Sequence, residues 1–252
     1  MSTFNAYSRY YDLLYKDKDY KSESAYVVEK LKKYFNNPNS ILELGCGSGS
    51  HANYLCKDGF SVFGIERSVQ MVEEAKNKKI NNFEILNSDI CVFRIDKKFD
   101  CAISLFHVIS YVTENSELIK CFQLTNQHLV KNGIFLFDVW FTPAVHALKP
   151  ERRVKKMEDE DTAVVRTAES KMNFMKNTVA VNFFVEVRDK ASDKKVELNE
   201  VHSMRHFSIP EIEMLATQTG FEILEVEEFL SAKAPGDDTW AVSFILKKIA
   251  DA

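Results

Sequence analysis

The sequence lacks any segment suited to crossing a membrane. No apolar run in its 252 residues approaches the ~20 residues that a membrane-spanning helix needs. The opening segment, residues 1–15, is polar and aromatic, without the basic start and apolar middle of a secretory signal. We therefore expect a cytoplasmic protein with no membrane partner.

A surplus of positive charge is also missing. Lys and Arg number 33 against 37 Asp and Glu, which gives a formal net charge of −4. Non-specific binding of nucleic acid depends on many cations that face phosphates. The balance therefore predicts no nucleic-acid partner, and local pairs such as Lys155–Lys156 indicate ordinary solvated faces.

Patterns of metal ligands are absent as well. The five cysteines, at positions 46, 56, 91, 101 and 121, form no C-x-x-C pair and have no histidine at metal-ligand spacing. An odd count without a secretory signal indicates reduced thiols. We expect no metal site, and we expect each cysteine to fill space as a small residue.

Glycine is scarce, with eight in the whole chain, so its concentration at one point is informative. Gly45, Gly47 and Gly49 alternate directly after the apolar segment 41–44. A strand that ends in a turn with so few side chains lets a ligand lie against the main chain. Glu43 inside this strand and Glu66 at the end of the next add carboxylates near the turn.

Apolar periodicity predicts helices and strands in alternation, beginning with helices over the first ~35 residues. The expected strands of this part are residues 40–44, 61–66, 83–90, 99–106 and 133–140. This alternation is typical of a parallel sheet with helices on both faces. A helix at 212–219 and strands at 221–229 and 239–248 close the chain, the last strand antiparallel.

Residues 162–207 follow a different pattern, with period-two alternation and polar turns at 175–177 and 190–194. Such alternation favours an antiparallel sheet with one solvated face. We therefore expect a doubly wound α/β domain from 1–144 and 208–252, with an antiparallel β insertion, 145–207, after strand five. The insertion is expected to cover an acceptor site or to form a dimer contact, so monomer and homodimer both stay open.

A glycine turn between a strand and a helix can bind a dinucleotide, or a nucleoside that has no phosphate. Dinucleotide-binding proteins use G-x-G-x-x-G, whereas this chain has G-x-G-x-G and no obvious Tyr-x-x-x-Lys pair, which disfavours a nicotinamide oxidoreductase. Glu66 can accept hydrogen bonds from ribose hydroxyls in either case. Asp89 closes the third strand, a place where an aspartate commonly forms a turn.

The run ILELGCGSG at residues 41–49, with Glu66 and Ser88-Asp89-Ile90 after it, resembles motif I and the following elements of class I S-adenosylmethionine-dependent methyltransferases. The resemblance implies a seven-stranded Rossmann-like sheet and S-adenosylmethionine as cofactor. The cofactor-binding residues it implies are Tyr11, Tyr20, Glu43, Gly45, Cys46, Gly47, Gly49, Glu66, Arg67, Met71, Asp89, Ile90 and Leu105.

Within that family the chain most resembles the sugar-nucleotide N,N-dimethyltransferases. The segment RYYDLLYKDKDY at residues 9–20 matches their Y-D-L followed by K-D-Y, and Trp140-Phe141 precedes Pro143 as an aromatic pair after strand five. The resemblance implies methyl transfer to the amino group of a nucleotide-linked deoxyaminosugar. The candidates it implies are His107, Tyr111 and His202 for catalysis, and Trp140, Phe141 and Arg205 for the small-molecule substrate.

Other acceptors and other roles stay open from the sequence. The family often has histidine where Tyr111 stands, so a base at that position is in question. An O- or N-methyltransferase acting on a non-sugar molecule, or a module that binds the cofactor without catalysis, fits the same motifs. Because a sulfonium methyl is already activated, we expect alignment to contribute more than any general base.

Overall fold

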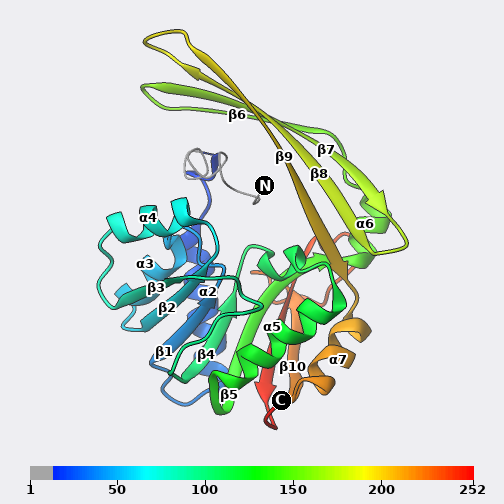
Figure 1. Ribbon diagram of the computed structural model, residues 1–252. Coiled ribbons are helices and arrows are strands. Elements are labelled where there is room, and N and C mark those ends of the chain that lie inside the picture. The colour runs from blue at the N-terminus through cyan, green and yellow to red at the C-terminus, as the bar shows by residue number, and fades with distance from the viewer. Residues whose placement is uncertain (1–13) are drawn as a thin grey trace.

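The computed structural model describes residues 14–252, and a mostly parallel sheet forms its centre (Figure 1). The parallel strands are β1 (Ser40–Leu44), β2 (Ser61–Glu66), β3 (Phe83–Asn87), β4 (Phe99–Ser104) and β5 (Leu129–Phe141). β11 (Ala241–Lys248) pairs antiparallel with β5, and β10 (Phe221–Glu228) pairs antiparallel with β11. The order β3-β2-β1-β4-β5-β11-β10 confirms the predicted doubly wound α/β sheet of seven strands.

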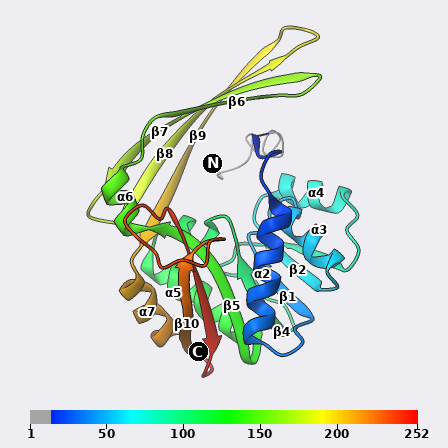
Figure 2. The same cartoon turned by 180° about the vertical axis from the view of Figure 1, so that it is seen from behind.

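Helices cover both faces of this sheet. They are α2 (Tyr20–Tyr34), α3 (Ser50–Lys57), α4 (Val69–Asn77), α5 (Asn115–Gln127) and α7 (Ile209–Gln218). α2 and α3 bury apolar residues against one face, which Figure 2 shows from their side, whereas α5 and α7 pack on the other. On that second face the Phe122 ring of α5 contacts Phe135 and Phe137 of β5 edge-on, with centroids 5.3 and 5.4 Å away.

Polar contacts cap one of these helices and attach another to the sheet. Ser68 caps α4, because its hydroxyl oxygen accepts a hydrogen bond from the Met71 amide. On α2, Lys30 is buried and its ammonium lies 2.7 Å from a Glu227 carboxylate oxygen on β10. Tyr26 donates to the same carboxylate, so the apolar face of α2 is held to the sheet by a paired buried charge.

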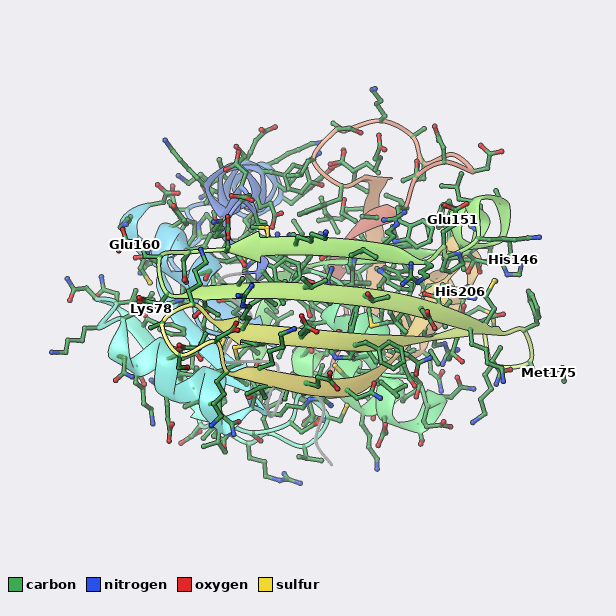
Figure 3. All side chains as sticks on the ribbon, turned by 90° about the horizontal axis from the view of Figure 1, so that it is seen from above. Lys78, His146, Glu151, Glu160, Met175 and His206 are labelled. Atoms are coloured by element: carbon green, nitrogen blue, oxygen red, sulfur yellow. The ribbon has the colours of Figure 1, made fainter. Side chains whose placement is uncertain are left out.

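Four antiparallel strands form the insertion. They are β6 (Arg153–Glu158), β7 (Thr162–Asn173), β8 (Thr178–Asp189) and β9 (Lys195–Phe207), and α6 (Thr142–Leu148) leads into them. β9 pairs with β5 only at Trp140↔His206 and Phe141↔Phe207, which joins the insertion to the central sheet. Seen from above, its strands cross over the core, with the turn at Glu160 at one end and the turn at Met175 at the other (Figure 3).

β6 is absent from the strands expected from the sequence, because Lys155 and Lys156 indicated a solvated charged face. The structure corrects this reading for one of the two lysines. Lys155 donates to the carbonyl oxygen of Leu14, and its ammonium lies 5.1 Å from the Tyr15 ring centroid. Lysines are common on edge strands, because their charge discourages pairing of the open edge with a further strand.

Two of the expected strands end two or more residues early. β4 stops at Ser104 instead of residue 106, because Phe106 and His107 adopt left-handed backbone conformations, with φ of 63° and 62°. β3 stops at Asn87 instead of residue 90, because the Asp89 carboxylate accepts a hydrogen bond from the Cys91 amide and turns the chain. Both bends lie at the carboxyl ends of parallel strands.

Residues 14–252 contain no helix that is both long and apolar enough to span a membrane. Within the same residues, no three His, Cys, Asp or Glu side chains gather in a way that could hold a metal ion. All five cysteines are free thiols, and Cys46, Cys101 and Cys121 are buried. The last observation agrees with the packing role expected for these three.

Candidate active site

A cavity of about 540 Å³ lies where the parallel strands end and the insertion begins. Open α/β sheets bind ligands at this edge, beyond the carboxyl ends of the strands. One wall comes from the loops after β1, β2, β3 and β4, and the other from the inner face of β7–β9. The volume falls within the range of small-molecule sites.

Most of the side chains and glycines chosen from the sequence line this one cavity. They are Tyr20, Gly45, Cys46, Gly47, Glu66, Arg67, Met71, Asp89, Ile90, Leu105, His107, Tyr111, Trp140 and His202. Tyr11, the other tyrosine expected at the cofactor, lies outside the described residues. The elements meet because parallel strands end at the same edge of the sheet.

The glycine turn meets two different demands. Gly45 has φ of 71°, and a Cβ there would lie 2.5 Å from the Val108 Cγ1 atom on the short 3-10 helix η2 (Val108–Tyr111). Gly47 has φ of 55°, yet nothing lies within 4 Å of the place where its Cβ would be. Gly45 therefore allows close packing of the protein on itself, whereas Gly47 leaves bare main chain facing the cavity.

Glu66 ends β2 with its carboxylate in the cavity wall. One oxygen accepts a hydrogen bond from the Gly47 amide at 3.0 Å, and the other accepts one from the Ser68 amide at 2.7 Å. Burial raises the pKa of this carboxyl, an effect that the two amides oppose. Each carboxylate oxygen keeps a further lone pair, so the group can accept hydrogen bonds from two neighbouring hydroxyls.

The loop after β3 adds a carboxylate, Asp89, and an apolar side chain, Ile90, to the cavity wall. Asp89 is both a turn residue and a cavity residue: one oxygen accepts the Cys91 amide at 2.8 Å, and the side chain lines the cavity. Ile90 and Val92 border the same region, and Val92 is 64% exposed. An apolar surface beside a carboxylate suits a flat heteroaromatic ring that carries an amino group.

Tyr111 and His202 come together from separate parts of the chain. The Tyr111 hydroxyl lies 2.9 Å from His202 Nδ1, and His202 Nε2 lies 3.3 Å from a Glu200 oxygen. Burial lowers the pKa of His202 to about 4 and raises the pKa of Tyr111. Both groups are therefore neutral near pH 7, and they serve better as fixed hydrogen-bonding groups than as proton acceptors.

His107 lies in the same cavity with a buried acid behind it. Its Nδ1 is 2.6 Å from Asp138 Oδ2, and the Asp138 side chain on β5 is 1% exposed. The Trp140 ring lies edge-on to the imidazole, with centroids 6.3 Å apart. Asp138 is absent from the residues expected from the sequence, where it lies inside an apolar strand without a motif around it.

Four of the expected site residues lie outside the lining of this cavity. Successive residues of a strand point to opposite sides, so Trp140 faces the cavity while Phe141 enters the apolar core. Gly49 caps α3 with φ of 76° and packs toward Phe83. Arg205 pairs with Glu211 and binds the Thr113 carbonyl, which turns its guanidinium away from the cavity.

Glu43 is the fourth of these, because it lies beneath the glycine turn and is 2% exposed. His51 Nδ1 is 3.8 Å from its Oε1 atom, and its Oε2 atom has no hydrogen-bond partner among the described residues. Burial, with the neighbouring Glu66 carboxylate, raises the pKa of Glu43 to about 8. Glu43 is therefore a neutral acid at pH 7.

Several cavity residues were not predicted as site residues. They are Tyr15, Phe106, Val108, Arg153, Arg166, Phe183, Met204 and Trp240. A signal existed for Arg166: it shares the strand parity of Val164 and Ala168, which are both buried on the inner face of β7. This alternation identifies Arg166 as a cavity residue only after the structure shows which side of β7 faces inward.

The cavity fits the cofactor expected from the sequence. Gly47 offers main chain with open space before it, and Glu66 offers two acceptors at the spacing of a ribose diol. Asp89 with Ile90 and Val92 suits an adenine ring. None of these features demands a phosphate site at the turn, in agreement with a nucleoside that has no phosphate.

Comparisons with known proteins agree with this geometry. The model of a family described as methyltransferase domain matches residues 17–226. A putative methyltransferase of Geobacillus sp. strain WCH70 is 26% identical over 251 residues, covering 98% of this chain and all of the relative. The dTDP-3-amino-3,6-dideoxy-alpha-D-glucopyranose N,N-dimethyltransferase of Streptomyces fradiae is 24% identical over 221 residues, 84% of this chain and 82% of its own.

A solved structure extends the likeness to three dimensions. S-adenosylmethionine-bound CalS10, an amino pentose methyltransferase from Micromonospora echinaspora, superposes with a TM-score of 0.77 at 19% identity and covers 98% of both chains. Fold, glycine turn and family model therefore agree. The chain belongs to the methyltransferase domain family and is an S-adenosylmethionine-dependent methyltransferase.

Proposed function

We propose that this methyltransferase acts on the amino group of a nucleotide-linked deoxyaminosugar. The Streptomyces fradiae relative is named for such an acceptor, and CalS10 is described as an amino pentose methyltransferase. Since both share under 25% identity with this chain, the argument depends on the second half of the cavity. That half is formed by the insertion, 145–207, which in this proposal covers the acceptor.

The observation that carries the proposal is the pair of arginines on the inner face of the insertion. Arg153 of β6 and Arg166 of β7 both line the cavity opposite the glycine turn. Arg166 is held in place: its Nη1 donates to the Tyr15 hydroxyl at 2.9 Å, and its guanidinium lies 4.8 Å from the Phe183 ring centroid. Guanidinium forks match the oxygens of a diphosphate, and a positioned fork loses little freedom on binding.

Aromatic rings also line the cavity. Trp140 and Trp240 both border the cavity, with ring centroids 5.4 Å apart. Large rigid rings bind flat or ring-shaped ligands at small entropic cost, and they exclude water from the reacting groups. A sugar ring placed here has its diphosphate toward the insertion and its amino group toward Tyr111 and His107.

In this proposal the chain contributes binding and alignment. Gly47 and Glu66 hold the cofactor's amino acid and ribose portions, and Asp89 and Ile90 hold its adenine. When bound, S-adenosylmethionine supplies a methyl group on a sulfonium sulfur that is already activated for attack. Tyr111, fixed by His202, accepts a hydrogen bond from the acceptor amine and directs its lone pair.

A transfer assay tests the acceptor class. With radiolabelled S-adenosylmethionine, we expect methylation of a dTDP-linked aminosugar and at least tenfold lower kcat/KM with the free aminosugar, simple amines or phenols. Equal rates with and without the nucleotide would remove the proposed acceptor.

Two arginine variants provide the matched comparison. Arg166→Ala is expected to raise KM for the nucleotide sugar at least tenfold, since a hydrogen bond to a charged group contributes ~1.5–3 kcal/mol. The affinity for S-adenosylmethionine stays unchanged. Arg188→Ala serves as the control, because Arg188 is exposed on the same sheet and pairs with Asp193 away from the cavity.

A further inference from the structure

His107 and Asp138 form a contact that alignment of the cofactor does not require. The Asp138 carboxylate is almost fully buried, and its Oδ2 atom lies 2.6 Å from His107 Nδ1. The imidazole is 18% exposed and lines the cavity. With Nδ1 turned to the carboxylate, Nε2 is the ring nitrogen available to a ligand.

The same carboxylate also holds the backbone of His107. The His107 amide donates to both Asp138 oxygens, at 3.3 and 3.2 Å. Phe106 and His107 are consecutive non-glycine residues with left-handed φ, a conformation that costs free energy and persists only where its surroundings impose it. Asp138 therefore fixes the bend through the His107 amide. It also places a carboxylate oxygen 2.6 Å from Nδ1, although the alignment of these two atoms is not that of a hydrogen bond.

We propose that His107 and Asp138 act as a proton-accepting dyad for the acceptor amine, with Asp138 keeping the His107 proton on Nδ1 and Nε2 taking the proton that the acceptor loses. This inference rests on the proposed function, because it applies to an acceptor that arrives protonated. His107 is the catalytic residue of the pair. Asp138 is a positioning residue, since it contacts the acceptor only through the ring.

The proton step balances as follows for an ammonium acceptor. Nε2 accepts one proton, and the electron pair of the broken N–H bond stays on nitrogen as the lone pair that forms the new N–C bond. The methyl C–S bond breaks at the same time, and its electron pair remains on sulfur. His107 then releases its extra proton to solvent, and the product leaves as the methylated ammonium.

The other two candidates for a base are less suited. His202, with its pKa lowered to about 4 by burial, binds a proton weakly near neutral pH. Burial raises the pKa of Tyr111, which keeps its hydroxyl protonated. His107 has the buried Asp138 carboxylate behind it, the arrangement in which an acid stabilises an imidazolium. His51 also lines the cavity, but its Nε2 lies 2.7 Å from a Glu23 oxygen and burial lowers its pKa.

Other charged and titratable groups lie near the dyad and influence its protonation. The Lys18 ammonium lies 4.5 Å from the Phe106 ring centroid, next to His107 in the chain. His51 of α3 interacts electrostatically with Asp138, and burial lowers its own pKa. Tyr111 lines the same cavity. The variants below leave all of these groups in place.

His107→Asn is the central variant, because asparagine tolerates left-handed φ and keeps a donor for Asp138 without accepting a proton. We expect kcat with an aminosugar nucleotide to fall ~10²-fold or more at pH 7. The loss shrinks as the pH rises and the amine deprotonates unaided. Binding of S-adenosylmethionine and thermal unfolding stay near wild type. A loss below threefold at every pH would overturn the dyad.

Nuclear magnetic resonance of ¹⁵N-labelled histidine tests the geometry without any acceptor. The dyad predicts that His107 carries its proton on Nδ1, and that Asp138→Asn moves it to Nε2, since the new amide donates to Nδ1. A His107 with its proton on Nε2 in the wild type would overturn the dyad even if no acceptor is methylated. Failure of the aminosugar proposal, by contrast, leaves this spectrum unchanged.

A matched control separates the loss of any histidine from the loss of this one. His146 is exposed on α6 and lies outside the cavity lining. His146→Asn is expected to leave kcat and its pH dependence unchanged. An equal effect of His146→Asn and His107→Asn would argue against the dyad.

Discussion

At the scale of single residues, the two glutamates near the glycine turn differ in how far their surroundings stabilise a charged carboxylate. Glu66 accepts two backbone amides, which stabilise its charged form, whereas the inner oxygen of Glu43 has no partner among the described residues. Motif reading gave both the same role, that of a cofactor ligand. The difference follows from burial and hydrogen bonding, which a sequence pattern does not contain.

Glu43→Gln tests this difference through stability. The wild-type carboxyl has a pKa of about 8 when folded and ~4.3 when unfolded. Between these values the unfolded chain releases the proton and the folded chain keeps it, so rising pH favours unfolding. Above pH 5 we expect the free energy of unfolding of the variant to gain on wild type by up to ~1.4 kcal/mol per pH unit, ending near pH 8.

Urea unfolding of the cofactor-free protein at pH 4.5, 6 and 8 measures this gain. Glu84→Gln is the control, because Glu84 is 64% exposed and pairs with Lys97 at the surface. Parallel stability curves for wild type and Glu43→Gln would show that Glu43 is ionised in the folded protein.

At the scale of elements, the glycine turn depends on η2 as much as on its ligand. Val108 occupies the space beside Gly45, and the left-handed bend at Phe106 and His107 brings η2 there. Asp138 of β5 secures that bend through the His107 amide. Three chain segments therefore share one corner of the cavity.

Gly45→Ala is expected to lower the melting temperature and weaken binding of S-adenosylmethionine, because its Cβ meets Val108 and its φ is unfavourable. Adding Val108→Ala relieves the clash but not the strain, so the double variant should be more stable than the sum of the single losses predicts. Strict additivity of the two stability losses would contradict the packing described for Gly45.

Alternation of apolar residues was enough to predict the strands and helices of the core, but not all of their ends. β4 and β3 end where Phe106–His107 and Asp89 turn the chain, and the first of these turns depends on Asp138, 31 residues away. β6 was missed because Lys155 binds partners supplied by another segment, Leu14 and Tyr15. Such interactions depend on tertiary structure.

At the scale of the whole molecule, the site forms between two sheets. The glycine turn, Glu66 and Asp89 were predictable because strand ends of a parallel sheet meet at one edge. The inner face of the insertion was not, since period two leaves open which parity faces inward. Arg166 faces the cavity, while Arg205, near the end of β9, is captured by Glu211 of α7.

The position of the cofactor decides the account of the site. A crystal structure of the full chain with S-adenosylhomocysteine measures it directly. We expect the ribose hydroxyls on the Glu66 carboxylate, the adenine between Asp89 and Val92, and the amino acid portion along the Gly47 main chain. A ribose bound away from Glu66, or a ligand outside the cavity between the glycine turn and the insertion, would contradict this account.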